Sequence, residues 1–218
     1  MQQQTKESNY PAIKTSNWGI ALENTRFRNK IIAGLLMFTF ILLLFPYFFA
    51  FIEARNGLVL NDFLLDYLTP HDFSIPIFII IWSTTILLII RCINQPAIFL
   101  QVIYCLVILC IARMMTIYLV PLDPPLGLIK IKDPLTSLTY GGKDVFITKD
   151  LFFSGHTSNM LMMAMCFQKR SDKWLGFIAA FLVGILVLFQ HVHYSIDVIG
   201  ALVITFFLVK LGKRLADH

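Results

Sequence analysis

Charged residues are scarce in this chain. They make up 14% of its 218 residues, whereas 57% are hydrophobic, and the mean hydropathy is +0.74. Soluble globular domains carry about 25% charged residues, so this composition excludes that class and indicates an integral membrane protein. An internal repeat, a low-complexity tract and a second domain are also lacking.

Cysteine is equally scarce, and its placement limits the chemistry that it can do. The four cysteines (Cys92, Cys105, Cys110 and Cys166) fall within or at the edge of apolar runs. That placement argues against a disulfide framework and a zinc site, and it predicts small core residues. We expect the first apolar run to be a true span and not a cleavable signal peptide, because it starts about thirty residues in, has 22 residues and carries no small-residue cleavage site.

Six apolar runs, by contrast, are present, and each predicts a membrane-spanning helix, since about 20 residues cross a hydrocarbon core. The runs cover residues 31–52, 73–90, 97–120, 151–167, 174–189 and 196–209. The last three are short, which is acceptable where a helix extends into flanking polar residues or lines a protein-enclosed cavity. We therefore expect an all-α fold with a tail at 1–30, a six-helix transmembrane domain at 31–210 and a second tail at 211–218.

Lysine and arginine are distributed unevenly over the predicted connections. Twelve lie in the N-terminal tail, the second and fourth connections and the C-terminal end, whereas five lie in the first, third and fifth connections. By the positive-inside rule both tails are cytoplasmic, and the odd-numbered connections face the outer side of the membrane. This distribution accounts for the net charge of +5 without a nucleic-acid partner.

Two segments outside the apolar runs are expected to be structured. A short interfacial helix is predicted near Trp18. The connection 121–150 contains four prolines and three glycines among many apolar residues, so we expect an ordered cap on the outer surface. Its lysines are consistent either with attraction of an anionic head group or with a solvated loop face; they are Lys130, Lys132, Lys143 and Lys149.

Polar side chains cluster where the fourth and the sixth runs begin. Ser154, Gly155, His156 and Thr157 open the fourth run, and His193 and Asp197 stand at the start of the sixth. The two histidines are 37 residues apart, which is one down-and-up hairpin, so both are expected at the outer surface.

Asp197 lies four residues beyond His193, the spacing that places two side chains on one face of a helix. A carboxylate there can accept the imidazole N–H, fix the tautomer, and stabilise the charge that develops when the other nitrogen acts as base or nucleophile. A structural pair that pins the last two runs is the alternative. His156 by itself is equally compatible with a helix cap or an interfacial anchor.

Arg113 is the one basic residue inside a predicted span, seven residues before the outer end of the third run. An ionisable residue in a span is energetically expensive, so it is by default a functional hypothesis and needs a partner. For Arg113 that partner is Asp197, Asp150 or a bound phosphate, and a purely structural ion pair is an open alternative. A metal site built from His191, His193 and Asp197 is disfavoured, because residues i and i+2 of a helix point apart and no further ligand completes the set.

Two longer motifs contain these residues. Residues 150–157 are D-L-F-F-S-G-H-T, and residues 191–198 are H-V-H-Y-S-I-D-V. They resemble the two motifs of the sphingomyelin synthases, Asp-x3-Ser-Gly-His-Thr and His-Tyr-Ser/Thr-x-Asp-Val. Residues 112–116, A-R-M-M-T, fit the Arg-x-x-Thr of that family's third span, and residues 61–67, N-D-F-L-L-D-Y, resemble the segment between its first two spans. The similarity covers roughly residues 31 to 210.

That family belongs to the wider superfamily of type 2 phosphatidic acid phosphatases, whose Ser-Gly-His and His-x3-Asp pieces this chain shares. The phosphatase branch usually carries Lys-x6-Arg-Pro and an arginine six residues before the second histidine, whereas this chain has no Arg-Pro pair and has Val187 at that position. The resemblance therefore favours the transferase-like branch. Thr148 and Lys149 depart from the Cys-Gly that usually precedes the aspartate, and Leu202 stands where tyrosine is usual, which bears on the head group and the acceptor.

The resemblance implies a six-span helical bundle of the phosphatidic acid phosphatase type and an enzyme that acts on lipids. His193, oriented by Asp197, would attack the phosphorus of a phospholipid donor to give a phosphohistidine, while His156 protonates the departing lipid alkoxide. A ceramide or diacylglycerol hydroxyl then takes the phospho-head-group; a phosphatase or phospholipase C-like hydrolase would use water instead. The residues expected to bind the phosphate are Arg113, Ser154, Gly155 and Thr157, with Asp150 in support.

A non-catalytic lipid-binding or transport protein is the alternative from another class. Transport leaves polar residues along a pathway through several spans, whereas here they concentrate at the outer end and the inner halves are nearly all apolar. We therefore expect an enzyme in the lipid bilayer, without metal or cofactor, whose site lies at the outer (exoplasmic, periplasmic or lumenal) face. The sequence does not predict its oligomeric state.

Overall fold

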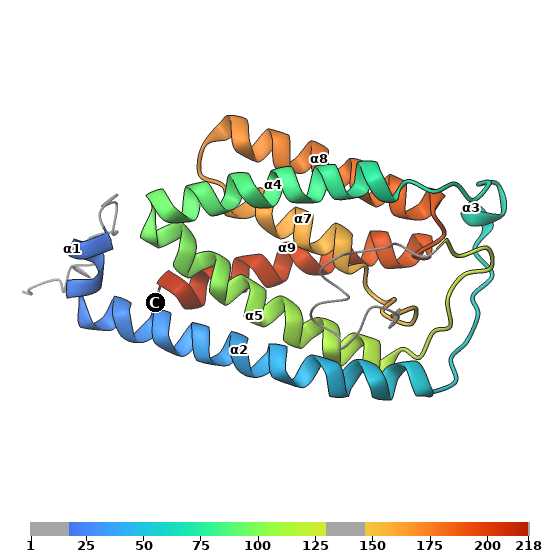
Figure 1. The fold of residues 1–218 in the computed structure, drawn as a ribbon, viewed down its shortest axis with the longest axis horizontal. Coiled ribbons are helices and arrows are strands. Elements are labelled where there is room, and N and C mark those ends of the chain that lie inside the picture. Colours follow the sequence, from blue (N-terminus) through green and yellow to red (C-terminus); the bar gives the residue numbers. More distant parts are fainter. Residues whose placement is uncertain (1–17, 130–146, 218) are drawn as a thin grey trace, which may run out of the picture.

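Long helices run side by side along one axis in the computed structural model, which describes residues 18–129 and 147–217 (Figure 1). The helices are α1 (Trp18–Glu23), α2 (Thr25–Ala54), α3 (Phe63–Asp66), α4 (Ser74–Asn94), α5 (Pro96–Leu119), α7 (Gly155–Cys166), α8 (Arg170–Phe189) and α9 (Ser195–Asp217). The described residues contain no strand, and an isolated β-bridge pairs Leu58 with Leu122. The prediction of an all-α fold is confirmed.

One end of the bundle, which we call the site end, is where α2, α5 and α8 end and where α4, α7 and α9 begin (Figure 1). The two ends of the described chain meet at the opposite end. There Lys30 Nζ of α2 donates a hydrogen bond over 2.8 Å to the carbonyl of Ala216. Because the last carbonyls of a helix have no partner within it, this contact caps α9 and joins the first and last long helices.

α7 is the central helix of the bundle. Nine of its twelve residues are buried, and it packs between α8 and α9. A Cβ on Gly176 of α8 would lie 2.8 Å from Cα of Ala164 in α7, and one on Gly212 of α9 would lie 2.9 Å from Cα of Cys105 in α5. Glycine at these two positions therefore sets the close spacing of the helices. Cys105 and the other three cysteines are free thiols.

Of the described helices, five are long and apolar enough to cross a membrane: α2, α4, α5, α8 and α9. They support an integral membrane protein. The fourth predicted span, residues 151–167, forms only the twelve-residue α7, which is about 18 Å long against a hydrocarbon core of about 30 Å. The chain ahead of Gly155 is not helical, and α7 is surrounded by protein, so its length need not match the bilayer. The prediction of six spans is therefore not confirmed.

The helices at both ends of the chain extend further than predicted. The short helix expected near Trp18 is present as α1. α2 begins at Thr25, inside the predicted tail, because Asn24 Oδ1 accepts backbone N–H groups of the first turn as an N-cap. α9 continues to Asp217, beyond the predicted end of the last run. The start of α2 and the end of α9 do not coincide with the predicted boundaries between the tails and the transmembrane domain. The division into tails and domain therefore stays a prediction.

The long connection between α5 and α7 is described at both of its ends. Residues 121–129 lie against the site end, where Leu122 packs with Leu65 and Tyr194. Residues 130–146, which include three of the four lysines named above, fall outside the described residues. The predicted cap is therefore described only in part.

Candidate active site

The start of α7 is bonded to the start of α9. Ser154 is the N-cap of α7: its Oγ accepts the backbone N–H of Thr157 over 3.4 Å and donates to Thr157 Oγ1 over 3.1 Å. The Ser154 backbone N–H donates over 3.1 Å to the carbonyl of Asp197 in the first turn of α9. All three residues are buried. The N–H groups at the beginning of α7, with their partial positive charge, therefore lie beside α9.

Arg113 reaches this helix end from α5. Its Nη2 lies 2.5 Å from Asp150 Oδ1, and its Nε donates to the carbonyl of Phe153 over 3.1 Å. Of the partners expected from the sequence, Asp150 is in contact with Arg113. The guanidinium covers Gly155, where a Cβ would lie 2.6 Å from Cζ of Arg113. A fixed positive charge and the N-terminus of α7 thus converge on one point, which favours an anion there.

The first turn of α9 holds the second half of the site. Asp197 Oδ2 accepts the backbone N–H of Tyr194 over 2.9 Å, which is the contact of a capping box. The same oxygen lies 3.4 Å from Nδ1 of His193, an ion-pair distance without the geometry of a hydrogen bond. His193 is 2% exposed and Asp197 is fully buried. The carboxylate is therefore held by the backbone in a position from which it faces the histidine ring.

The two histidine rings predicted to act together lie next to each other. The ring centroids of His156 and His193 are 6.1 Å apart, and the ring planes are inclined by 65°. His193 is buried, whereas His156 keeps partial exposure. One ring is thus held inside the bundle, and the other is accessible from the surface.

Contacts join the eight residues predicted to form the site: Arg113, Asp150, Ser154, Gly155, His156, Thr157, His193 and Asp197. They come from α5, α7 and α9, from the segment before α7 and from the link between α8 and α9. The arrangement combines an anion-binding helix end, a guanidinium and two imidazoles, one of which faces a carboxylate. These groups suit the transfer of a phosphoryl group, although the role of each residue stays a prediction.

His191 points to other partners. Its Nδ1 lies 2.8 Å from the carbonyl oxygen of Leu126, and its Nε2 lies 2.9 Å from that of Leu68. Both ring nitrogens therefore lie within hydrogen-bonding distance of backbone carbonyls. The backbone φ of 52° at His191 is uncommon for a residue with a Cβ. Through its contacts with Leu126 and Leu68, His191 anchors the link between α8 and α9.

Among the described residues, no group of three or more His, Cys, Asp or Glu side chains is arranged to hold a metal.

Glu53, at the end of α2, is a residue that the sequence motifs miss, yet it holds the segment that carries Asp150. Its Oε1 accepts the backbone N–H groups of Thr148 and Lys149 over 2.6 and 2.7 Å, and its Oε2 accepts the Thr148 hydroxyl over 3.0 Å. Lys149 Nζ in turn lies 2.9 Å from Asp123 Oδ1, and this close ammonium group lowers the pKa of Asp123. An acid just beyond an apolar run is the one sequence signal for Glu53.

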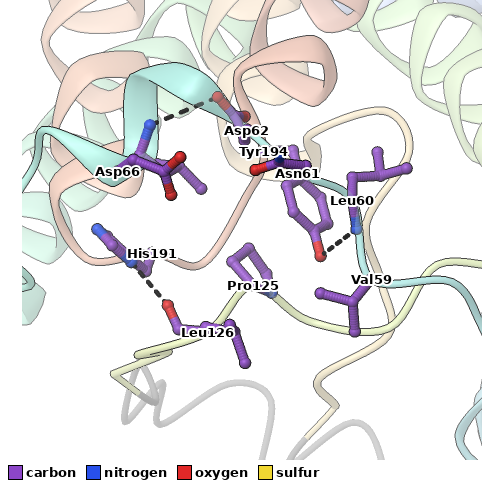
Figure 2. Close-up of a pocket in the computed structure, with 10 residues that line it drawn as sticks. Val59, Leu60, Asn61, Asp62, Asp66, Pro125, Leu126, His191 and Tyr194 are labelled. Atoms are coloured by element: carbon purple, nitrogen blue, oxygen red, sulfur yellow. Dashed lines mark hydrogen bonds between the residues drawn. The ribbon is translucent and has the colours of Figure 1, made fainter.

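Tyr194 is a second missed residue and fixes the link between α8 and α9 from its other end. Its hydroxyl donates to the carbonyl of Asp123 over 2.9 Å and accepts the N–H of Leu60 over 3.1 Å. The side chain is 1% exposed, and burial raises the pKa of its hydroxyl. Figure 2 shows Tyr194 beside a cavity of about 250 Å³ that also borders the connection between α2 and α4. Two connections that are distant in sequence therefore brace the link that carries His193.

Comparison with known proteins supports the resemblance at the level of the superfamily. Residues 149–214, which are 66 of the 218 residues, match the family model described as PAP2 superfamily C-terminal. This match supports the type 2 phosphatidic acid phosphatase superfamily, whose members are generally phosphatases or phosphotransferases acting on lipids. It contains α7, α8 and all but the last three residues of α9, and so every predicted site residue except Arg113. Searches of curated proteins and of solved structures find no match.

Proposed function

We propose that this chain is a membrane-embedded lipid phosphotransferase of the sphingomyelin synthase type. It moves the phospho-head-group of a phospholipid to the hydroxyl of ceramide or diacylglycerol through a phosphohistidine. The observation that carries the proposal is the pair of rings of His156 and His193, with centroids 6.1 Å apart, at a helix end that the Arg113 guanidinium covers.

His193 is the nucleophile in this proposal. Its Nδ1 faces Asp197, which leaves Nε2 to attack the phosphorus. A bond forms between Nε2 and phosphorus, the bond from phosphorus to the glycerol oxygen breaks, and His156 gives a proton to the departing diacylglycerol oxygen. Asp197 stabilises the positive charge that the attacking ring acquires.

The separation of the two rings suits an in-line displacement. In a near-attack geometry the nucleophilic nitrogen stands about 3 Å from phosphorus, and the departing oxygen lies about 3 Å from the acid. Together with the bond from phosphorus to the departing oxygen, these distances require the two reacting nitrogens to stand several ångströms apart, and the ring centroids of His156 and His193 are 6.1 Å apart. A phosphoryl group between the rings therefore has both a nucleophile and an acid within reach.

Arg113 and the first turn of α7 bind the phosphoryl oxygens. Asp150 holds Nη2 of Arg113 and the carbonyl of Phe153 holds its Nε, so the guanidinium is oriented before a substrate arrives. Positive groups that are fixed in advance stabilise the charge of the transition state more than mobile ones do. The hydroxyls of Ser154 and Thr157 add polar groups at the same helix end.

The acceptor completes the cycle. Its hydroxyl oxygen attacks phosphorus, His156 takes the hydroxyl proton, and the bond between Nε2 of His193 and phosphorus breaks. The superfamily match supports lipids that carry phosphate as the substrate class. The choice of a phospholipid donor and a ceramide or diacylglycerol acceptor comes from the resemblance of residues 150–157 and 191–198 to the sphingomyelin synthase motifs.

A lipid phosphate phosphatase or phospholipase C-like hydrolase with the same residues is the second candidate. The partial exposure of His156 favours it, because water then has access to the group that would activate it. The missing Arg-Pro pair and Val187 favour the transferase. What separates the two is whether an alcohol or water reaches the phosphohistidine first.

The test follows the phosphorus. Purified protein in detergent is incubated with phospholipids that differ in head group, with and without ceramide and diacylglycerol, and the products are resolved by mass spectrometry. His193→Ala is the control, because it removes the nucleophile. We expect a new phospholipid built on the acceptor, absent with His193→Ala.

Three other outcomes would contradict the proposed transferase mechanism. Free phosphate or a free phospho-head-group, lost with His193→Ala, would make the protein a hydrolase. Turnover that survives in His193→Ala would contradict the mechanism. No product from any lipid, in protein shown to be folded, would favour the non-catalytic lipid-binding alternative.

A further inference from the structure

One carboxylate at the site end binds the first turns of two helices. Asp62 Oδ1 accepts the backbone N–H groups of Leu64 and Leu65 over 3.1 and 3.4 Å, which makes Asp62 the N-cap of α3. Its Oδ2 accepts the backbone N–H of Ser195 over 2.5 Å, and its Oδ1 also accepts the Ser195 hydroxyl over 3.0 Å. Asp62 borders the same cavity as Tyr194, the neighbour of Ser195 (Figure 2).

The Ser195 N–H is the first N–H group of α9, and such groups have no acceptor within their own helix. Two acids therefore serve the beginning of α9. Asp197, from the helix itself, accepts the N–H of Tyr194, and Asp62, from the connection between α2 and α4, accepts the N–H of Ser195. The negative charge of Asp62 also lies against the positive end of the helix dipole.

The position of His193 depends on where α9 begins. His193 stands two residues before Ser195, in the five-residue link between α8 and α9. Its ring faces Asp197 of α9 on one side and His156 of α7 on the other. A displacement of the first turn of α9 would therefore change both contacts at once.

We propose that Asp62 is a positioning residue for the nucleophile. It touches no reacting atom; it holds the start of α9, so that His193 and Asp197 keep their places relative to His156. This inference rests on the proposed function, in which His193 attacks phosphorus. It assigns a role in turnover to the connection between α2 and α4, which the catalytic motifs do not include.

The test compares two acids of one short helix. Asp62→Asn keeps the shape of the side chain, but it removes the charge and replaces one acceptor oxygen by a donor. Asp66→Asn is the matched control, because Asp66 ends the same helix, is exposed and loses the same charge. Ser195→Ala removes only the hydroxyl contact and keeps the backbone N–H bond to Asp62.

Two readouts apply to the purified proteins. In the lipid assay, a displaced nucleophile lowers kcat by about ten- to a hundredfold while KM stays within about twofold. We expect this for Asp62→Asn, a smaller fall in kcat for Ser195→Ala, and no change for Asp66→Asn. In hydrogen exchange followed by mass spectrometry, we expect faster exchange of the peptide spanning residues 193–197 in Asp62→Asn only.

Several results would overturn the inference. One is an unchanged kcat in Asp62→Asn despite faster exchange at the start of α9. Another is a fall in rate that matches the loss of folded protein, since that indicates a purely structural role. If the wild-type protein turns over no lipid, the proposed function fails on its own account. Hydrogen exchange still decides whether Asp62 holds the link that carries His193, and unchanged exchange would refute it.

Discussion

Gly155→Ala tests whether Arg113 lies where the structure places it. On helix propensity alone this change would stabilise the first turn of α7 by about 0.5 to 1 kcal/mol. The structure predicts the opposite, because the added Cβ would lie 2.6 Å from Cζ and 2.8 Å from Nη2 of Arg113. The guanidinium must then shift, and it cannot do so without distorting its contacts with Asp150 and with the carbonyl of Phe153.

The expected size of the effect follows from these contacts. Hydrogen bonds to a charged group contribute about 1.5 to 3 kcal/mol when buried, and partial exposure of the Arg113 and Asp150 side chains, 14% and 30%, reduces that value. We expect Gly155→Ala to lower the free energy of unfolding by about 1 to 2 kcal/mol after the gain in propensity. Turnover should fall about a hundredfold, the usual effect of misplacing a binding group by about 1 Å.

The assay is a double-mutant cycle in the lipid assay and in thermal unfolding in detergent. If the effect of Gly155→Ala acts through Arg113, adding it to Arg113→Ala should cost little more activity than Arg113→Ala alone. Gly184→Ala of α8 is the comparison, because its added Cβ would lie 3.2 Å from a side-chain carbon of Val198 and 3.6 Å from Thr157, without meeting the guanidinium. It should therefore lose much less activity than Gly155→Ala. Additive losses, or a stable and fully active Gly155→Ala protein, would refute the placement of the guanidinium.

Three further predictions concern acids at the site end. Asp197→Asn keeps the side-chain volume but removes the charge that faces His193, so kcat should fall about a hundredfold or more with KM little changed; a change in KM alone would contradict this. Glu53→Gln weakens the cap on the segment before α7 and should lower the free energy of unfolding by about 1 to 3 kcal/mol, measured by denaturation in detergent. An unchanged stability would show that the cap is unimportant. Lys149→Met removes the partner that lowers the pKa of Asp123. A depressed carboxyl pKa stabilises the fold above the ordinary value of 3.8 and loses that effect as the pH falls through the folded value. The difference in thermal midpoint between wild type and Lys149→Met should therefore be largest at neutral pH and shrink in strong acid to the part that comes from the hydrogen bond of Lys149 Nζ to the carbonyl of Arg55; a difference that does not change with pH would refute the ion pair.

Helices were predictable from the sequence where apolar residues continue without interruption. α4, α5 and α8 lie close to the predicted runs, because hydropathy detects the stretch that a membrane would bury. The ends of α2 and α9 were not predictable in this way, since Asn24 and Lys30 cap these helices with polar groups that hydropathy does not count. α7 begins only at Gly155, because the Ser154 N-cap follows an irregular stretch that is as apolar as the helix.

Some features of the candidate site were predictable from the sequence, and others were not. The spacing of four residues between His193 and Asp197 predicted that they share one face of a helix. That prediction is wrong in its detail, because His193 stands in the link before α9, and the capping contact of Asp197 with Tyr194 places the carboxylate beside the ring. The closeness of Arg113 to Gly155 was not visible, because it depends on how α5 crosses the start of α7. Asp62 lies in the segment 61–67 that the resemblance includes, but no role was predicted for it, since its contacts join segments 133 residues apart.

By itself the sequence determined that the chain is helical and apolar enough for a membrane, and which polar residues stand at the beginnings of the fourth and sixth runs. These features follow from the order of residues along the chain, so they do not depend on contacts between distant segments. Only the tertiary structure decided that Asp150 is the partner of Arg113, that α7 is a short enclosed helix, and that acids from the α2 end and its connection hold the site together. These contacts form only when the helices pack, because each joins atoms that the chain keeps far apart until it folds.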